Sequence, residues 1–240
     1  MIDLHCHLLP GLDDGATDLD DAVGMALQAQ ADGVAAICAT PHIRHDHDVR
    51  ISGLAARLEE VIAAVRTAGC RTRILPGGEV AVTALDGLDD GELAAVSLGG
   101  SARWILLEPA PGPLDDQLDD AVESLRSHGF RALIAHPERH LVGDLVQRLR
   151  RLIARDALVQ ATAATLTDDA TRQGMLQLAR AGVIHVLGSD AHSSREGRPV
   201  ALSASLEVLG AIEPIGEHLE WIARTAPEAI IEGRELSAPF

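Results

Sequence analysis

Histidines and acidic residues recur in this chain directly after short apolar segments, and this recurrence constrains the fold more than any other feature. The first apolar segment ends in His5 and His7. Residues two apart on a β-strand point to the same side, so both imidazoles can bind one metal ion. Asp190 and His192 repeat this spacing near the other end of the chain. The sequence therefore predicts a site assembled from the ends of several strands.

Short apolar segments alternate with amphipathic segments along the chain. This pattern predicts strands at 1–4, 35–39, 73–75, 104–107, 132–135, 158–161 and 184–187. It predicts helices at 19–31, 52–68, 114–127, 141–154, 168–181 and 201–209. Thr17 and Thr167 are the expected helix N-caps. Three glycines follow predicted helices as C-caps do: Gly69, Gly129 and Gly182.

Alternating strands and helices indicate an α/β protein with a parallel sheet. Candidate ligands follow nearly every predicted strand, and side chains from so many strand ends meet at one point only when the strands form a ring. We therefore expect a (β/α)7-like distorted TIM barrel, with its site at the carboxyl ends of the strands. A doubly wound sheet is the less favoured alternative. Residues 1–240 are expected to form a single domain.

Nine side chains share this place after a strand. They are His5, His7, Asp14, His42, Glu79, Glu108, His136, Asp190 and His192. Nine ligands are too many for one tetrahedral ion and suit two or three. Imidazoles and carboxylates without thiolates are typical of Mn, Fe or Zn sites. Taken singly, each has an ordinary structural role, such as a helix cap for Asp190, but their shared position favours metal binding.

The charges of this set point to a phosphate substrate. Four carboxylates combined with three divalent ions leave a positive charge that suits a phosphate dianion. Arg139 follows His136 by three residues, and Arg198 follows His192 by six. Because a guanidinium can bind phosphate through two parallel hydrogen bonds, we interpret both as phosphate-binding residues. The alternative is a pair of surface arginines bound to Glu138 and Glu196.

The composition excludes several other chemistries. The chain has no Lys and no Tyr, which removes Schiff-base, P-loop and carbamylated lysines and a tyrosine nucleophile. A net charge of −16 argues against binding to nucleic acid or anionic membranes. Three widely spaced cysteines do not indicate a disulfide framework. With no apolar run of spanning length and no secretory signal, we expect a cytoplasmic protein that is not embedded in a membrane.

A cysteine-dependent phosphatase is one rival interpretation. It needs a thiolate followed by an arginine in a phosphate-binding loop, and Cys38 precedes Arg44 by the required six positions. The segment between them lacks the glycines that open such a loop, and Cys38 lies within a predicted strand. We therefore interpret Cys38 as a small core residue.

Seven motifs extend through the chain: Met1-Ile-Asp-Leu-His-Cys-His7, Leu12-Asp-Asp-Gly15, Ala39-Thr-Pro-His42, Leu75-Pro-Gly-Gly-Glu79, Leu106-Leu-Glu108, Ile134-Ala-His-Pro-Glu-Arg139 and Gly188-Ser-Asp-Ala-His192. In these motifs the sequence resembles the PHP (polymerase and histidinol phosphatase) superfamily. Within it, the sequence resembles the manganese-dependent protein-tyrosine phosphatases of bacterial capsular and exopolysaccharide loci. The resemblance implies the PHP barrel and a phosphatase that uses two to three divalent ions, with Mn2+ preferred and Fe or Zn as alternatives.

The resemblance also implies roles for individual residues. The implied ligand sets are His5, His7, Glu79 and Asp190 for one ion, Glu79, Glu108 and His136 for a second, and Asp14, His42 and His192 for a third. Asp14 is preferred to its neighbour Asp13 on this resemblance alone. Arg139 and Arg198 match the substrate-binding arginines of the branch, and His192 or a metal-bound water is the candidate general acid. The implied partner is the phosphotyrosine-containing tail of a bacterial tyrosine kinase in polysaccharide synthesis.

Other functions stay open from the sequence. A small-molecule phosphomonoesterase, such as a histidinol-phosphate phosphatase, would use the same ligands. A catalytically silent metal-binding regulator is the non-enzymatic alternative. Few aromatic residues are available to stack on a phosphotyrosine ring, namely Phe130, Phe240, Trp104 and Trp221. His45, His47 and His140 are expected to lie in loops that line the site.

Overall fold

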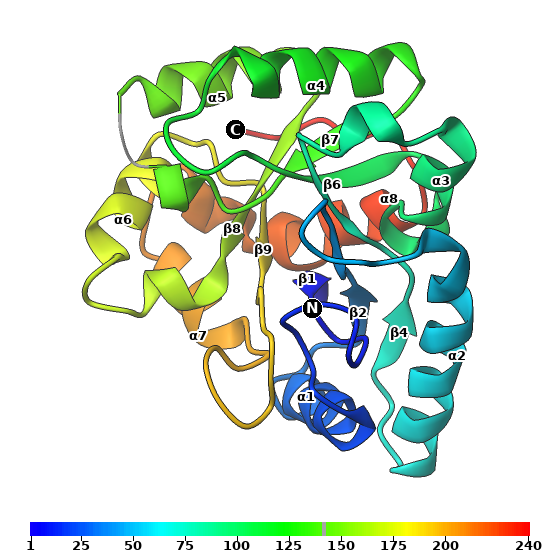
Figure 1. The fold of residues 1–240 in the computed structure, drawn as a ribbon. Helices are drawn as coiled ribbons and strands as arrows, with labels where there is room; N and C mark the ends of the chain where they lie inside the picture. Colours follow the sequence, from blue (N-terminus) through cyan, green and yellow to red (C-terminus); the bar gives the residue numbers. More distant parts are fainter. Residues whose placement is uncertain (141–142) are drawn as a thin grey trace.

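The computed structural model describes residues 1–140 and 143–240. Parallel strands form a curled central sheet, and helices surround it (Figure 1). The strands are β1 (Ile2–Cys6), β2 (Ala36–Ala39), β3 (His42–Ile43), β4 (Arg73–Leu75), β5 (Glu79–Ala81), β6 (Trp104–Glu108), β7 (Arg131–Ile134), β8 (Leu158–Thr162) and β9 (Val186–Gly188). The α-helices are α1 (Leu19–Ala31), α2 (Ile51–Thr67), α3 (Asp90–Ala95), α4 (Asp116–Ser127), α5 (Leu145–Ile153), α6 (Arg172–Arg180), α7 (Ser203–Leu209) and α8 (Ala226–Ile231).

Four of the labelled strands form two interrupted strands, β2 with β3 and β4 with β5. Strand β2 pairs with β4, and β3, which follows β2 after a two-residue break, pairs with β5. Ala36 is opposite Arg73 and His42 is opposite Glu79, so the offset along the chain is the same on both sides of the break. Glu79 and His42 are thereby placed side by side at the end of one continuous strand pair.

The strands follow one another around the ring in chain order. From β5 the pairing runs through β6, β7 and β8 to β9, and a parallel bridge between Cys6 and Ala191 joins the segment after β9 to β1. The expected (β/α)7-like distorted barrel is confirmed, with β2/β3 and β4/β5 each counted as one strand. All the strand ends that bear candidate ligands consequently lie at one end of the barrel.

Two apolar clusters lie on the two faces of the curled sheet. Leu4, Leu106 and Leu133 belong to a cluster inside the ring, which includes Ala226 and Ile230 of α8. The second, larger cluster lies between the outer face of the strands and the surrounding helices, and it includes Cys6.

An irregularity in β1 reverses which side chains face inward. Leu4 and Cys6 are two residues apart, yet they belong to opposite clusters. The pairing register between β1 and β2 shifts between Asp3 and Cys6, which inserts an extra residue into β1. This shift turns His5 and His7 toward the inside of the ring, although Leu4 also faces inward.

The predicted helix positions agree with the structure, but two N-caps were wrong. Asp18, not Thr17, caps α1, since its carboxylate accepts a hydrogen bond from the amide of Asp21 at 2.8 Å. Thr167 lies at the end of a short 3₁₀ turn and does not cap α6, which begins after Thr171. Three glycines have the positive φ of a helix end, as expected: Gly69, Gly129 and Gly182. The helix predicted at 141–154 begins later, at Leu145, and positions 141 and 142 lie outside the described residues.

The short helices α3 and α8 were not predicted, because six-residue helices show too little periodicity. In the part of the chain that the structure describes, no helix combines the length and the apolarity that crossing a bilayer demands.

Asp21 joins the first and last units of the barrel. Its buried carboxylate accepts hydrogen bonds from the amide and hydroxyl of Ser194 at 2.7 Å each and from the hydroxyl of Ser193. The amide of Thr17 also donates to it, at 3.2 Å. Burial opposes ionisation of Asp21, but the hydrogen bonds from Ser194 outweigh it and lower its pKa to about 2. The carboxylate therefore connects the start of α1 to the loop that follows His192.

Asp21→Asn should lower the free energy of unfolding at pH 7 by about 1–3 kcal/mol, because the amide presents N–H groups to donors that need an acceptor. An unfolded Asp has a pKa of about 3.9. Since the folded pKa is lower, this stabilisation is present above pH ~4 and is lost as the pH falls toward 2. Urea unfolding at several pH values measures both effects. Asp20→Asn, at an exposed neighbour, is the control and should change stability by less than about 0.5 kcal/mol.

Candidate metal centre

The nine predicted ligands meet at the carboxyl end of the barrel. Their donor atoms form four groups, and within each group these atoms lie within 4.8 Å of one another. The groups are His7, Asp14, His42 and His192; His5, His7 and Asp190; His5, Glu79 and His136; and His42, Glu79 and Glu108. Because members are shared, the four groups form one continuous cluster.

Glu79 lies at the centre of this cluster, and its side chain is only 1% exposed. Its Oε2 is 3.2 Å from His5 Nε2, 3.3 Å from His7 Nε2 and 3.0 Å from His42 Nδ1. Its Oε1 is 2.8 Å from His136 Nε2. Burial opposes ionisation, but His5 and the other imidazoles outweigh it and hold the pKa of Glu79 well below its usual range. One carboxylate thus contacts four histidines.

His5 and His7 are each oriented by a second side chain. Gln160 Oε1 lies 3.0 Å from His5 Nδ1, and Asp13 Oδ2 lies 2.8 Å from His7 Nδ1. With the Nδ1 protons engaged there, the two Nε2 atoms face each other at 3.2 Å. Two imidazole lone pairs at this separation repel unless a proton or a cation lies between them. The arrangement is that of metal-binding histidines fixed by outer hydrogen bonds.

Unsatisfied nitrogen atoms provide a further test of whether these residues fit a metal. Among the described residues, the buried Nδ1 atoms of His42 and His136 have no hydrogen-bond partner. Buried polar atoms without partners are unusual in folded proteins. His42 Nδ1 is 3.0 Å from Glu79 Oε2 and 3.7 Å from Glu108 Oε2, a donor set of the kind that divalent ions bind. The residues present therefore fit metal ions.

Asp13 and Asp14 have different environments. The carboxylate of Asp13 is occupied by His7 and by the backbone amides of His42 and Gly15, at 2.8 and 3.0 Å. Burial opposes its ionisation, but His7 lowers its pKa to about 2. Asp14 is exposed, and its Oδ1 lies 3.5 Å from both His42 Nε2 and His192 Nε2. Asp13 thus supports the cluster from behind, whereas Asp14 faces two of its imidazoles.

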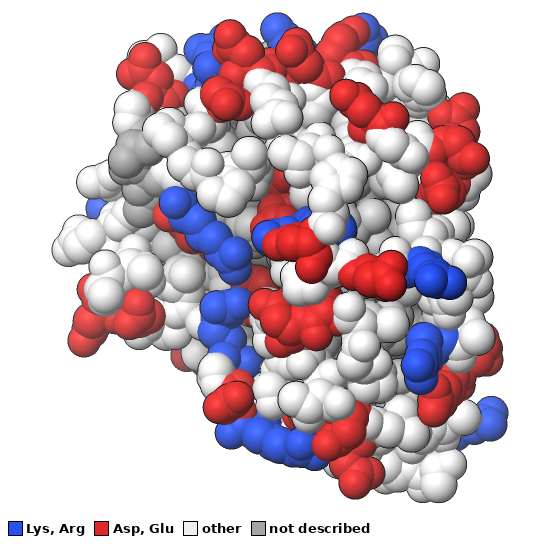
Figure 2. Space-filling model, viewed as in Figure 1, with Lys and Arg blue, Asp and Glu red and all other residues white. Residues whose placement is uncertain are grey.

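Asp190 connects the histidines to the two predicted arginines. Its Oδ1 lies 3.5 Å from His5 Nε2, whereas Oδ2 binds Arg139 and, at 2.9 Å, Arg198. Burial opposes ionisation, but His5 and Arg139 outweigh it and lower the pKa of Asp190 to about 2. The two arginines are 44% and 36% exposed, so they face both the cluster and solvent. Figure 2 shows basic side chains in a band beside acidic ones on this side of the molecule.

The arginine partners differ from the sequence-based alternative. Neither guanidinium pairs with Glu138 or Glu196 among the described contacts; both bind Asp190 instead. Glu138 is buried and accepts a hydrogen bond from the amide of Thr162.

Backbone strain occurs at two of the candidate ligands. His136 has φ 32° and Asp190 has φ 51°, both in the left-handed region. Such conformations cost about 1–3 kcal/mol in a residue other than glycine and concentrate at functional sites. The surrounding hydrogen bonds hold both side chains toward the cluster despite this cost.

The grouping of Glu108 differs from the ligand set that the family resemblance implied. Glu108 lies with His42 and Glu79, whereas His136 lies with His5 and Glu79. Burial and the nearby charge of Glu79 raise the pKa of Glu108. On its other side, Glu108 binds Arg44 Nη1 at 3.2 Å.

Three residues at the site were missed from the sequence. Gln160 is a polar residue inside the apolar strand β8, and Asp3 is one inside β1, where its Oδ1 binds the amides of His5 and Ser189. Arg44 follows His42 by two residues, the spacing that places side chains on one side of a strand. Each signal was present in the sequence, but polar residues in strands and arginines in loops are too common to be decisive.

Of the loop histidines, His47 contacts a candidate ligand, whereas His45 and His140 contact backbone carbonyl oxygens. The ring of His47 stacks on that of His42, with 5.2 Å between centroids. His45 Nε2 is 3.0 Å from the carbonyl oxygen of Thr83, and His140 contacts the carbonyl oxygen of Gly112. All three cysteines are buried, and burial raises the pKa of Cys38 to about 12. A thiol of this kind is not a nucleophile near neutral pH.

Two curated bacterial proteins are similar to this chain in sequence. Tyrosine-protein phosphatase YwqE of Bacillus subtilis (strain 168) is 31% identical over 200 residues, which cover 80% of this chain and 78% of YwqE. Putative tyrosine-protein phosphatase CapC of Staphylococcus aureus is 29% identical over 200 residues, covering 80% of this chain and 77% of CapC.

Solved structures show the same fold. One chain from the crystal structures of YwqE from Bacillus subtilis and CpsB from Streptococcus pneumoniae, described as unique metal-dependent tyrosine phosphatases, matches with a TM-score of 0.80. The match is at 25% identity and covers 98% of this chain and 96% of that one. The phosphotriesterase homology protein of Escherichia coli has a TM-score of 0.59 at 13% identity, covers 96% of each chain and shares the fold alone.

A family model described as capsular polysaccharide synthesis, CpsB/CapC, matches residues 1–231. With this match over almost its whole length, the chain belongs to the CpsB/CapC family of capsular polysaccharide synthesis proteins.

Proposed function

We propose that this chain is a metal-dependent protein-tyrosine phosphatase that acts on phosphotyrosine in a bacterial tyrosine kinase of capsule or exopolysaccharide synthesis. The observation that carries the proposal is the convergence of nine donor side chains in one cluster centred on Glu79, with two arginines bound to Asp190, which is one of the nine. The names of the relatives and the family of the chain support the same activity.

The four groups of donors would hold two or three divalent ions, and Mn2+ suits their mixture of imidazole and carboxylate, with Fe and Zn as alternatives. Glu79 would be shared between ions because both of its oxygens face histidines. Asp14 fits a ligand role better than Asp13, whose oxygens are occupied by His7 and two backbone amides. Bound divalent ions supply Lewis acidity, which polarises phosphoryl oxygens and makes water a nucleophile near neutral pH.

The protein's own residues would position the substrate. Arg139 and Arg198 place positive charge at the edge of the cluster, where the phosphate dianion would bind. Burial and the neighbouring His7 lower the pKa of His192 to about 4. His192 Nε2 lies 3.5 Å from Asp14 Oδ1 and belongs to the donor group with His7 and His42, so we assign His192 the ligand role.

The reaction would proceed without a phosphoenzyme. Water attacks phosphorus, the bond from phosphorus to the tyrosine oxygen breaks, and tyrosinate leaves and takes up a proton. Tyrosinate has a pKa of about 10, so its departure needs electrostatic stabilisation. The buried thiols of Cys6 and Cys38, whose pKa values burial raises, are unsuited to replace water as the nucleophile.

The proposal is tested first on substrates. With Mn2+ present, a phosphotyrosine peptide should be hydrolysed at least tenfold faster than a phosphoserine peptide or histidinol phosphate, when kcat/KM values are compared. A chelator should abolish this activity, and iodoacetamide should leave it intact because the cysteines are buried. Preferred hydrolysis of histidinol phosphate would favour the small-molecule alternative, and a phosphocysteine trapped by acid quench would refute the water mechanism.

His136→Ala and Asp190→Ala should each lower kcat by at least about a hundredfold, because each removes a donor from the cluster. Metal content measured on the purified variants should fall in parallel with activity. The control is His128→Ala, which alters an exposed histidine paired with Asp90 and should keep both metal and activity. Wild-type rates in either cluster variant would contradict the proposed ligands.

Arg198→Ala should chiefly raise KM, by about tenfold, because a positive group that holds the phosphate acts in the bound ground state as well as in the transition state. Arg195→Ala is the matched control, since Arg195 lies three residues away and pairs with Asp18. Steady-state kinetics on a phosphotyrosine peptide measure both variants. A large loss of kcat at unchanged KM would instead assign Arg198 to the transition state.

A further inference from the structure

A cavity lies next to Glu108, beside the metal centre. It has a volume of about 220 Å³ and is formed by the segments 44–46, 81–83 and 108–111. Glu108 lines this cavity and also belongs to the donor group with His42 and Glu79. A molecule in the cavity would therefore reach the cluster directly.

The walls of the cavity combine apolar and cationic surfaces. Ala81, Pro109, Ala110 and Pro111 supply the apolar wall. The guanidinium of Arg44 lines the cavity too, and it is held by Glu108 at 3.2 Å and by Asp46 at 2.6 Å. A guanidinium over an apolar slot suits the face of an aromatic ring.

A hydrogen bond fixes the segments that form the cavity. His45 Nε2 lies 3.0 Å from the carbonyl oxygen of Thr83, which joins the loop after β3 to the loop after β5. Both residues line the cavity. The shape is thus held by contacts between loops and does not depend on a ligand.

We propose that this cavity receives the aromatic ring of the phosphotyrosine and gives the enzyme its preference for aryl over alkyl phosphates. The inference rests on the proposed function and names the specificity element of the same site. A cavity of about 150 Å³ accommodates a benzene ring, so 220 Å³ is sufficient. Prolines and the Arg44 guanidinium would supply the surface against which the ring packs, since none of the described residues that line the cavity is Phe or Trp.

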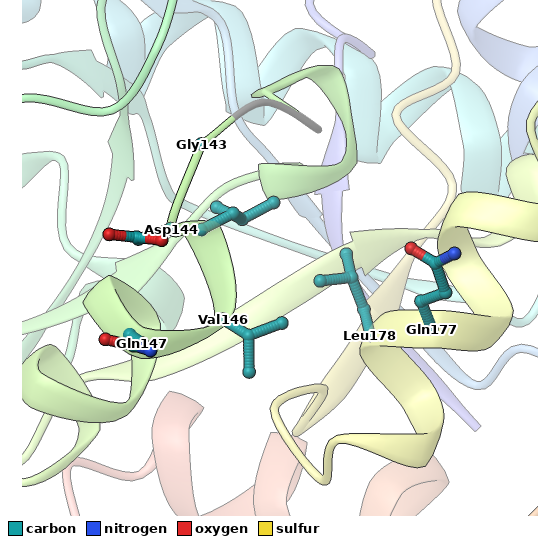
Figure 3. A pocket seen from close by; sticks show the side chains of 7 residues that line it. Gly143, Asp144, Val146, Gln147, Gln177 and Leu178 are labelled. Atoms are coloured by element: carbon teal, nitrogen blue, oxygen red, sulfur yellow. The ribbon is translucent and has the colours of Figure 1, made fainter.

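Two of the other cavities contain no residue of the metal centre. The cavity of about 280 Å³ at the start of α5 is lined by Asp144, just before α5, and by residues of α5 and α6, such as Val146 and Gln177, and contains no member of the metal centre (Figure 3). A second cavity, of about 230 Å³, lies against α2 and includes Ala55, but none of the nine candidate ligands lines it. It has a similar volume and serves as a control.

The test is the binding of two non-hydrolysable phosphonates to the Mn2+-loaded protein, measured by calorimetry. The wild-type protein should bind phenylphosphonate at least tenfold more tightly than methylphosphonate, because only the former buries a ring. Ala110→Leu places a larger side chain in the cavity and should weaken phenylphosphonate about tenfold, with methylphosphonate unchanged within twofold. Ala55→Leu, the same substitution in the cavity at α2, should leave both affinities unchanged.

Thr83→Leu, at an exposed residue that also lines the cavity, gives a second version of the test if Ala110→Leu destabilises the fold. Thermal unfolding identifies such a case. An aryl preference that persists in a folded filling variant would overturn the ring assignment. Binding does not require turnover, so this result is separate from the failure of the proposed function, which would appear as a lack of phosphotyrosine hydrolysis by the wild-type protein.

Discussion

The contact of the Glu79 carboxylate with four imidazoles is the interaction around which this structure is arranged. A buried carboxylate is unfavourable unless it is paired, and Glu79 has charge partners in His5, His7 and His42 and a hydrogen bond with His136. These histidines come from β1, β3 and β7 or the residues that follow them, and Glu79 begins β5. Only a curled sheet brings these strand ends within 3.3 Å of one carboxylate, so the barrel and the site require each other.

A second layer of side chains fixes the orientation of the first. Gln160 directs His5 and Asp13 directs His7, while Asp190 is held on its outer oxygen by two arginines. Each member of this layer holds one side of a ligand side chain through a hydrogen bond or an ion pair. The donor atom on the other side of that ligand then faces the cluster. Removal of such a residue would leave every donor atom of the cluster present, but the ligand side chains would be free to rotate. The cluster would lose its preorganised geometry although its set of ligands stays the same.

The sequence predicted the barrel and the meeting of candidate ligands at one end of it, because both follow from local spacing. His5 and His7 share a side through the two-residue repeat of a strand, and the order of strands and helices implies the barrel. The register shift in β1 could not be read from the sequence, since Leu4 and His5 cannot both face inward on a regular strand. The cap at Asp18 rather than Thr17 was also open, because adjacent residues of similar capping ability compete. The pairing of Arg44 with Glu108 depends on a contact across the ring, which local patterns do not encode.

The contacts of the arginines revise the expected mode of phosphate binding. Arg198 directs Nε and Nη2 at the carbonyl oxygen of Asp190, at 2.9 and 2.6 Å, so the fork that would bind phosphate through two parallel bonds is already occupied. Arg139 binds Asp190 through Nη2 alone, and its side chain is the more exposed of the two. Arg139 is therefore the better candidate for two-point binding of phosphate, while Arg198 would contribute its charge and its remaining Nη1. Both guanidinium groups neutralise the same oxygen of Asp190. A phosphate dianion bound by these arginines would weaken their attraction to the Asp190 carboxylate. The stabilisation of this carboxylate would then depend more strongly on its contacts with the cluster.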